Sequence, residues 1–293
     1  MLFQDILRLN EISEREVALC LHKPSDPVIR RTLAVLAEER ADLFDAYQAT
    51  HGELAEATVR SRRYFASFLS LIPGEATFLG LFEREIGPVL TEQDWLRDER
   101  LRDMNQRVDG HRATVEEKAR QLAGRTFFNL HRLPVTSAFE KRLTCRDPGG
   151  RNYLRRADTT PLEVLEYARE GRVAPPMPQW RELALTRAEL STLPRDWEIT
   201  LRAWRGVYLI VDEEDGARYV GSAYGLDNLL GRWRQHIAGD RGITVELSKR
   251  SPARFRFSIL ELVSPTAPDQ DVIAAETTWK LRLDTLRFGL NEN

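Results

Sequence analysis

Cysteine is scarce in this chain of 293 residues. The two cysteines, Cys20 and Cys145, cannot form a disulfide framework or a zinc cage alone, so we interpret both as structural thiols in a reducing compartment. No apolar run approaches the roughly 20 residues needed to span a bilayer. The first residues carry acids and lack the basic start and apolar stretch of a secretory signal. We therefore expect a cytoplasmic protein with no membrane partner.

Lysine is also rare, because only five of the 43 basic residues are lysines. Arginine binds phosphate in a bidentate manner, although a G·C-rich genome would produce the same bias. The net charge of −2 is unevenly distributed. Residues 120–156 hold nine basic side chains against two acids, and residues 232–256 hold seven against two. Two basic islands indicate a surface that binds a polyanion, and ordinary solvated charge is the alternative.

The sequence pattern predicts an α+β protein with three parts. Residues 1–60 read as a helical segment, with Asp26 as N-cap before Pro27. Residues 61–194 read as a β-rich mixed region, with a strand–turn–strand at Pro73-Gly74 and a hairpin about residues 147–150. A proline-rich connector at residues 175–178 leads to a boundary near residue 195.

Residues 195–293 read as a small α/β domain with a mainly antiparallel three-stranded sheet flanked by helices. We expect strands at 206–211, 217–221 and 254–263 and helices at 227–239 and 269–283. The two short strands carry one tyrosine each, Tyr208 and Tyr219, beside a glycine. A tyrosine in a half-buried strand usually serves packing, so the tyrosines alone do not establish a site.

Three further side chains point to chemistry at this domain. Arg232 and His236 lie one turn apart on the first helix, where they could hold a phosphate and move a proton. Glu276 falls within the apolar stripe expected for the second helix, where a carboxylate needs a cation, hydrogen bonds or a metal. A phosphodiester nuclease needs these parts together: a relay for water, a cation for the phosphate and an acidic metal ligand.

In this combination the chain resembles the GIY-YIG nuclease superfamily over about its last ninety residues. The name-giving motifs read Gly206-Val207-Tyr208 and Tyr219-Val220-Gly221, with valine in place of isoleucine in both. The helical arginine of the family matches Arg232, with Arg234 as the alternative. The late glutamate matches Glu276, and the asparagine near the end matches Asn291 or, as the alternative, Asn293. His236 resembles a subgroup that includes restriction endonucleases.

The resemblance implies metal-dependent hydrolysis of a DNA phosphodiester. It implies that Tyr208, assisted by His236, deprotonates or orients water, and that Glu276 holds one Mg²⁺ or Mn²⁺. Arg232 would stabilise the phosphate, while Tyr219 and Asn291 would position groups around it. A single carboxylate is a weak Mg²⁺ ligand, so the metal should bind poorly without DNA. The expected setting is a bacterial restriction, defence or repair endonuclease. A nuclease-derived DNA-binding module and a subunit active only with a partner are the alternatives.

The basic island before the connector predicts a second DNA contact. We expect a basic hairpin at residues 139–156 to hold DNA, with a tyrosine to contact sugar or base. The DNA-binding candidates are Arg142, Arg151, Tyr153, Arg155 and Arg156, together with Arg234 in the last domain. The expected partner is DNA, and a homodimer is left open.

Overall fold

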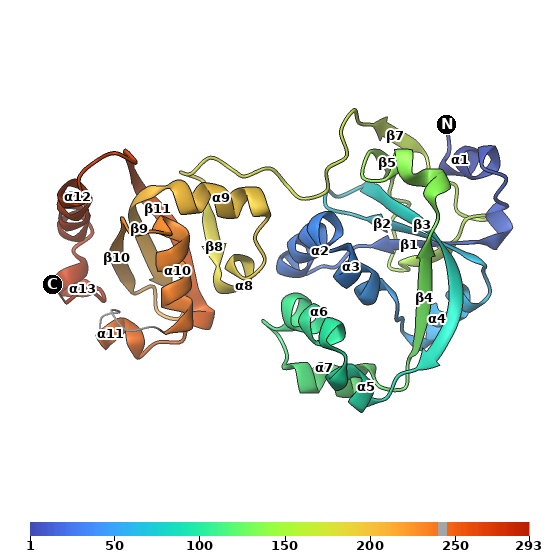
Figure 1. Ribbon diagram of the computed structural model, residues 1–293, viewed down its shortest axis with the longest axis horizontal. Coiled ribbons are helices and arrows are strands. Elements are labelled where there is room, and N and C mark those ends of the chain that lie inside the picture. Colours follow the sequence, from blue (N-terminus) through green and yellow to red (C-terminus); the bar gives the residue numbers. More distant parts are fainter. Residues whose placement is uncertain (240–244, 293) are drawn as a thin grey trace. The chain divides into compact units, whose positions relative to one another are not determined.

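The computed structural model describes residues 1–239 and 245–292, and they divide into two compact units, Met1–Pro175 and Pro176–Asn293 (Figure 1). Each unit has its own sheet. The fold is α+β, as the sequence predicted. The expected boundaries at residues 60/61 and 194/195 stay predictions. Among the described residues no helix has the length and apolarity to cross a membrane.

The first unit is built on a seven-stranded sheet in the order β6-β1-β2-β3-β5-β7, with β4 paired to β3. β1 and β2 are parallel, and every other pair is antiparallel. The turn at Pro73-Gly74 joins β2 to β3 as predicted. The strands are β1 Val17–His22, β2 Tyr64–Leu69, β3 Glu75–Val89, β4 Thr126–Arg132, β5 Leu143–Arg146, β6 Leu154–Arg156 and β7 Val164–Tyr167.

Helices cover this sheet and pack on one another. The predicted N-cap is confirmed, because the Asp26 carboxylate accepts from Val28 N at 2.8 Å at the start of α2. A separate core forms where α2, α3, α5, α6 and α7 meet, around Trp95 and Phe44. The helices are α1 Phe3–Leu9, α2 Pro27–Glu39, α3 Ala41–Gln48, α4 Glu53–Arg60, α5 Glu92–Arg97, α6 Glu99–Asp109 and α7 Val115–Leu122, with short η1 Glu14–Glu16 and η2 Pro134–Phe139.

Two expectations for this unit are wrong. Residues 1–60 are not purely helical, because β1 runs through the middle of the sheet and is buried throughout. The hairpin about residues 147–150 does not form either. β5 pairs with β3 and β7, whereas β6 pairs with β1 at the other side of the sheet. The Pro-Gly-Gly sequence makes a reversal, but the two strands go to different neighbours.

The second unit contains a four-stranded antiparallel sheet in the order β10-β9-β11-β8. The three strands predicted from sequence are present, and β8, which lies between the expected connector and the expected boundary near residue 195, adds a fourth. Helices α10 and α12 both pack against β9 and β10. The elements are β8 Ala184–Thr186, α8 Arg187–Leu190, α9 Arg195–Ala203, β9 Arg205–Asp212, β10 Arg218–Ala223, α10 Asn228–Ala238, α11 Val245–Ser248, η3 Pro252–Arg254, β11 Phe255–Val263, α12 Asp269–Arg282 and α13 Thr285–Phe288.

Candidate active site

The paired motifs of the β9–β10 hairpin place a glycine directly opposite a tyrosine. Gly221 of β10 is the register partner of Tyr208 of β9. A Cβ atom at Gly221 would lie 2.4 Å from Tyr208 Oη and 2.8 Å from Tyr219 Cε1. Because Gly221 has no side chain, both tyrosine rings can pack against the strand at this position. This close approach is the physical reason for the Tyr-Val-Gly spacing.

The glycine of the first motif has a different neighbour. A Cβ atom at Gly206 would lie 2.0 Å from the carbonyl oxygen of Glu261 on β11. The β9–β11 register shifts between Ile259 and Glu261, next to this contact. Gly206 therefore allows two strand backbones to approach at an irregular position in the ladder.

The hydroxyl of Tyr208 lies against the imidazole of His236 in the interior of the unit. The Tyr208 Oη to His236 Nε2 distance is 2.6 Å, and both side chains are buried. The His236 ring packs edge-on to both tyrosines, with centroids 5.6 Å from Tyr208 and 5.4 Å from Tyr219. His236 Nδ1 has no hydrogen-bond partner among the described residues. The structure thus joins a strand tyrosine to a helical histidine that lies 28 positions away.

Burial shifts the proton equilibria of this pair. It raises the pKa of Tyr208 above its ordinary value of 10, and the neighbouring Tyr219 adds to the rise. Burial, together with the charge of Arg232, lowers the pKa of His236 to about 3. His236 is therefore neutral near pH 7 and can accept a proton at Nε2. Tyr208 keeps its own proton at that pH unless a partner takes it.

Arg232 lies next to this pair on α10. Its positive charge opposes the rise in the pKa of Tyr208 and of Tyr219, which places its guanidinium close to both phenols. Its Nη1 donates to Gln235 Oε1 at 2.8 Å. The alternative arginine, Arg234, instead forms an ion pair with Glu198 of α9. The geometry favours Arg232 as the cation of the site.

Glu276 reaches the hairpin from α12. The hydroxyl of Ser222 on β10 donates to Glu276 Oε2, and Lys280 Nζ lies 2.8 Å from Glu276 Oε1. The carboxylate raises the pKa of Tyr208 and of Tyr219, so its charge acts on both phenols. These contacts bring Glu276 to the site expected from sequence. The sequence pattern predicts no site role for Ser222 or Lys280, although Ser222 directly follows the second motif.

The stripe expected around Glu276 is the least exposed side of α12, which packs on β9 and β10. Val272 is buried, but Trp279 and Leu283 are only partly buried. Trp279 donates from Nε1 to Glu261 Oε2 at 2.7 Å. This side of α12 is therefore polar where it meets the sheet, and a hydroxyl and an ammonium group offset the desolvation of Glu276.

The donor set around Glu276 suits a weakly held, hydrated divalent cation. Among the described residues, no cluster of three or more histidine, cysteine, aspartate or glutamate side chains is available to hold a metal. The Glu276 side chain is 16% exposed, and its carboxylate already accepts from Ser222. Mg²⁺ keeps most of its waters and takes further oxygen ligands from substrate phosphate, so one accessible carboxylate is compatible with it. The ion pair with Lys280 opposes binding in the absence of DNA.

Asn291 is fully engaged with the backbone of β10. Val220 N donates to Asn291 Oδ1 at 2.9 Å, and Asn291 Nδ2 donates to Val220 O at 2.8 Å. Because β10 is an edge strand, Asn291 supplies hydrogen bonds that a further strand would otherwise provide. These two hydrogen bonds let Asn291 stabilise the backbone of the second motif. The alternative, Asn293, lies outside the described residues.

The DNA-binding candidates of the first unit do not form one surface. Arg142 donates to Ala168 O at 2.9 Å and lies over the ring of Tyr167, and Arg155 donates to the backbone of Asn152 at 3.1 Å. Both therefore stabilise the backbone of their own unit.

Arg156 forms an ion pair with Asp158 at 2.8 Å. Arg151 and Tyr153 instead line a pocket of this unit. The candidates thus fall into two groups. Arg142, Arg155 and Arg156 contact neighbouring groups of the protein, whereas Arg151 and Tyr153 line the pocket.

Three buried histidines predict a loss of stability in acid. Burial lowers the pKa of His22 to about 4 and those of His51 and His236 to about 3, all below the ordinary 6.5. Below about pH 6.5 the unfolded chain binds protons that the folded chain does not, so the free energy of unfolding falls. Each histidine contributes ~1.4 kcal/mol per pH unit in this range. Thermal unfolding at pH 7.5 and pH 4.5 should show a lower midpoint in acid. His51→Gln should flatten this dependence, and the exposed His131→Gln should not.

A tyrosine–histidine pair, an arginine and a carboxylate on one small α/β unit are the kinds of group that a phosphodiester nuclease needs. Residues 205–291 match the family model described as the GIY-YIG catalytic domain. The matched residues lie wholly within the second unit and include the two tyrosine motifs, Arg232, His236, Glu276 and Asn291.

Two solved structures are similar to this chain. The catalytic domain of the homing endonuclease I-TevI is 26% identical, with 30% of this chain and 98% of that chain covered and a TM-score of 0.26. A mutant of the catalytic domain of the intron endonuclease I-TevI is 22% identical, with 31% and 94% covered and a TM-score of 0.27. No curated protein shows a significant match.

Proposed function

We propose that the chain is a metal-dependent DNA endonuclease acting in the cytoplasm of a bacterium, in restriction and defence or in repair. The observation that carries the proposal is the 2.6 Å contact between Tyr208 and His236, beside Arg232 and within reach of the charge of Glu276. These groups supply the proton relay, the phosphate-binding cation and the acidic ligand that phosphodiester hydrolysis needs. DNA is the proposed substrate and partner.

The proton relay runs from water through Tyr208 to His236. Tyr208 accepts a proton from the attacking water as its own proton passes to His236 Nε2. The water oxygen forms a new bond to phosphorus. The bond to the leaving oxygen breaks, and that oxygen keeps the bonding electrons and takes a proton from solvent. Neither group is a strong base alone, because burial keeps Tyr208 protonated and His236 neutral. The negative charge of a bound phosphate offsets that of Arg232 and raises the pKa of His236, so substrate binding itself favours the transfer.

Arg232 binds the phosphate through the donors that its contact with Gln235 leaves free. Tyr219 borders the same space, since its ring packs against His236 and its phenol lies near the guanidinium. Glu276 would hold a divalent cation, Mg²⁺ or Mn²⁺, which when bound supplies Lewis-acid stabilisation of phosphate charge. Ser222 orients the Glu276 carboxylate, and Lys280 neutralises it before DNA arrives.

Two other functions remain as rivals. A nuclease-derived DNA-binding module would bind DNA without turnover. A subunit would cut only with a partner or as a homodimer, because a domain of this size offers limited recognition surface. The presence of every expected side chain in the second unit favours the active enzyme over the first rival.

A plasmid assay tests the proposal. Purified protein is incubated with supercoiled plasmid and Mg²⁺ or Mn²⁺, beside the same reaction in EDTA. Cleavage that requires the ion supports the proposal, and discrete fragments would further indicate sequence specificity. An intact plasmid that shifts in a binding assay would reject an enzyme that acts alone and would favour one of the two rivals.

A further inference from the structure

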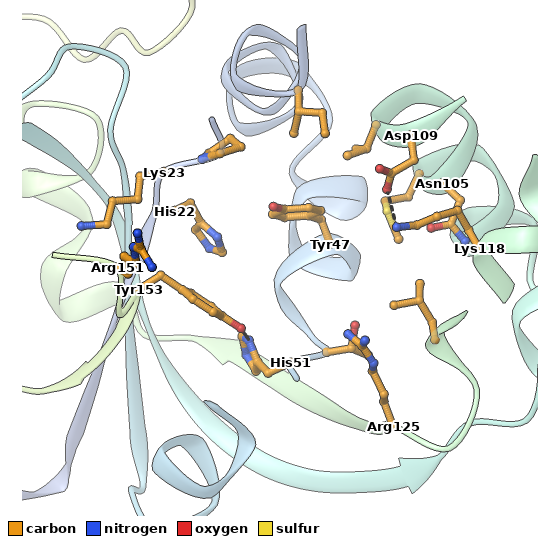
Figure 2. A pocket seen from close by; sticks show the side chains of 16 residues that line it. His22, Lys23, Tyr47, His51, Asn105, Asp109, Lys118, Arg125, Arg151 and Tyr153 are labelled. Atoms are coloured by element: carbon orange, nitrogen blue, oxygen red, sulfur yellow. Dashed lines mark hydrogen bonds and ion pairs between the residues drawn. The ribbon is translucent and has the colours of Figure 1, made fainter. Parts of the chain in front are cut away.

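A cavity of about 390 Å³ lies within the first unit, at the end of β1 where His22 is followed by Lys23. Its walls come from segments far apart in the sequence, from β1 through α3 and α6 to the loop before β6. Figure 2 shows Tyr47 near the centre, Arg151 and Tyr153 on one side, and Asn105 on the other. The volume suits one small molecule or one nucleotide and excludes a folded partner.

The charge of this cavity is positive and comes from arginine. Lys23 is paired with Asp147 at 3.1 Å, and Lys118 with Asp109 at 3.1 Å, so these lysines are neutralised. Arg125 and Arg151 have no side-chain hydrogen bond or ion pair within residues 1–239 and 245–292. The charge of Arg125 acts on both His51 and Tyr153, which places it at the cavity. Figure 2 shows the two arginines on different sides of the cavity, with Arg125 beyond His51. An unpaired guanidinium group favours an anion with several oxygens, such as a phosphate.

The walls between these charges are aromatic and uncharged. Tyr47, Tyr153 and His22 present rings to the cavity, and the Tyr153 hydroxyl lies 3.4 Å from His51 Nδ1. The pKa of each histidine is lowered by burial, so both are neutral near pH 7. Neutral rings suit stacking on a flat ligand.

One buried amide faces this space without a protein partner. Asn105 of α6 is 2% exposed, and neither its Nδ2 nor its Oδ1 has a hydrogen bond among the described residues. His51 Nε2 is likewise buried and unpaired. Leaving such groups unsatisfied is costly, so they mark a place for a polar ligand. An amide offers one donor beside one acceptor, which is the pattern that pairs with the edge of a nucleic acid base.

We propose that this cavity binds one nucleotide, with the phosphate on Arg125, the base among the rings, and the edge of the base on Asn105. The bound nucleotide is either a free nucleotide or a nucleotide swung out of DNA. The second source would let the first unit of the endonuclease inspect its substrate, and this role rests on the proposed function. The first does not depend on it.

Binding is measured with the full-length protein in EDTA, so that neither result requires catalysis. Calorimetry with the four deoxynucleoside 5′-monophosphates, the matching nucleosides and inorganic phosphate tests the free source. A duplex with one 2-aminopurine, whose fluorescence rises when it leaves the stack, tests the DNA source. The variants are Arg125→Gln, Arg151→Gln and Asn105→Leu, and the control is Arg97→Gln, an exposed arginine of α5 outside the cavity.

Binding of the nucleotide from either source should weaken about tenfold or more in Arg125→Gln, weaken less in Arg151→Gln and stay unchanged in Arg97→Gln. Asn105→Leu should reduce binding of nucleotides but not of inorganic phosphate, which separates the base contact from the charge contact. Thermal melts check that each variant is folded. The proposal is overturned by a protein that binds neither the monophosphates nor the flipped base. It is also overturned by binding that the three cavity variants leave unchanged.

Discussion

Replacing Glu276 with alanine should abolish plasmid cleavage, by about a thousandfold or more, and leave DNA binding nearly intact. A bound cation supplies several kcal/mol of charge stabilisation in the transition state, and ~4 kcal/mol corresponds to a thousandfold in rate. Glu276 is the carboxylate whose charge acts on both tyrosines, and Ser222 and Lys280 hold it in place. Cleavage is measured on gels and binding by fluorescence anisotropy with the same duplex.

Asp271→Ala is the matched control for this variant, because Asp271 is an exposed carboxylate of the same helix. It should cut at nearly the rate of the unaltered protein. If Glu276→Ala loses binding and cleavage to the same extent, the carboxylate is not a metal ligand and serves the fold or the DNA contact.

Gly221→Ala should destabilise the second unit and impair cleavage together. The added methyl would lie 2.4 Å from Tyr208 Oη, and Tyr208 is buried with no room to move aside. Overpacking of this kind typically costs about 1–3 kcal/mol. Displacement of the ring would also lengthen the 2.6 Å contact with His236, so the cleavage rate should fall by about a hundredfold. Thermal unfolding and the cleavage rate report the two effects.

Gly225→Ala separates this effect from a general response to losing a glycine. A Cβ atom at Gly225 would meet nothing within 4 Å. That variant should melt and cut like the unaltered protein. A Gly221→Ala protein with unchanged melting and cleavage would mean that Tyr208 does not lie across the strand as described.

The second unit was largely predictable because its signals are local. The β9–β10 hairpin, α10, β11 and α12 follow one another in the chain, and each neighbouring strand pair is antiparallel. The contact between Tyr208 and His236 was expected from the family resemblance rather than from spacing. The hydrogen bonds of Asn291 to Val220 could not be predicted from the residues, because they depend on which strand lies at the edge.

The first unit was harder to predict because its sheet is assembled from distant segments. β1 pairs in parallel with β2 across three helices, and β6 returns to β1 from far along the chain. The turn signal near residue 149 predicted a reversal but carried no information on which strands would pair. For the same reason the cavity residues, such as His22, Asn105 and Arg151, gave no common signal in the sequence.

The most direct test of the proposed chemistry is the single-turnover cleavage rate of Tyr208→Phe at saturating DNA and metal. This variant fills the same buried space and removes only the oxygen that contacts His236. The proposed relay predicts a loss of about a hundredfold or more in rate, with DNA binding and the melting temperature little changed. A rate within about twofold of the unaltered protein would contradict it, since general acid–base groups contribute at least a hundredfold, and would leave Tyr208 a packing residue.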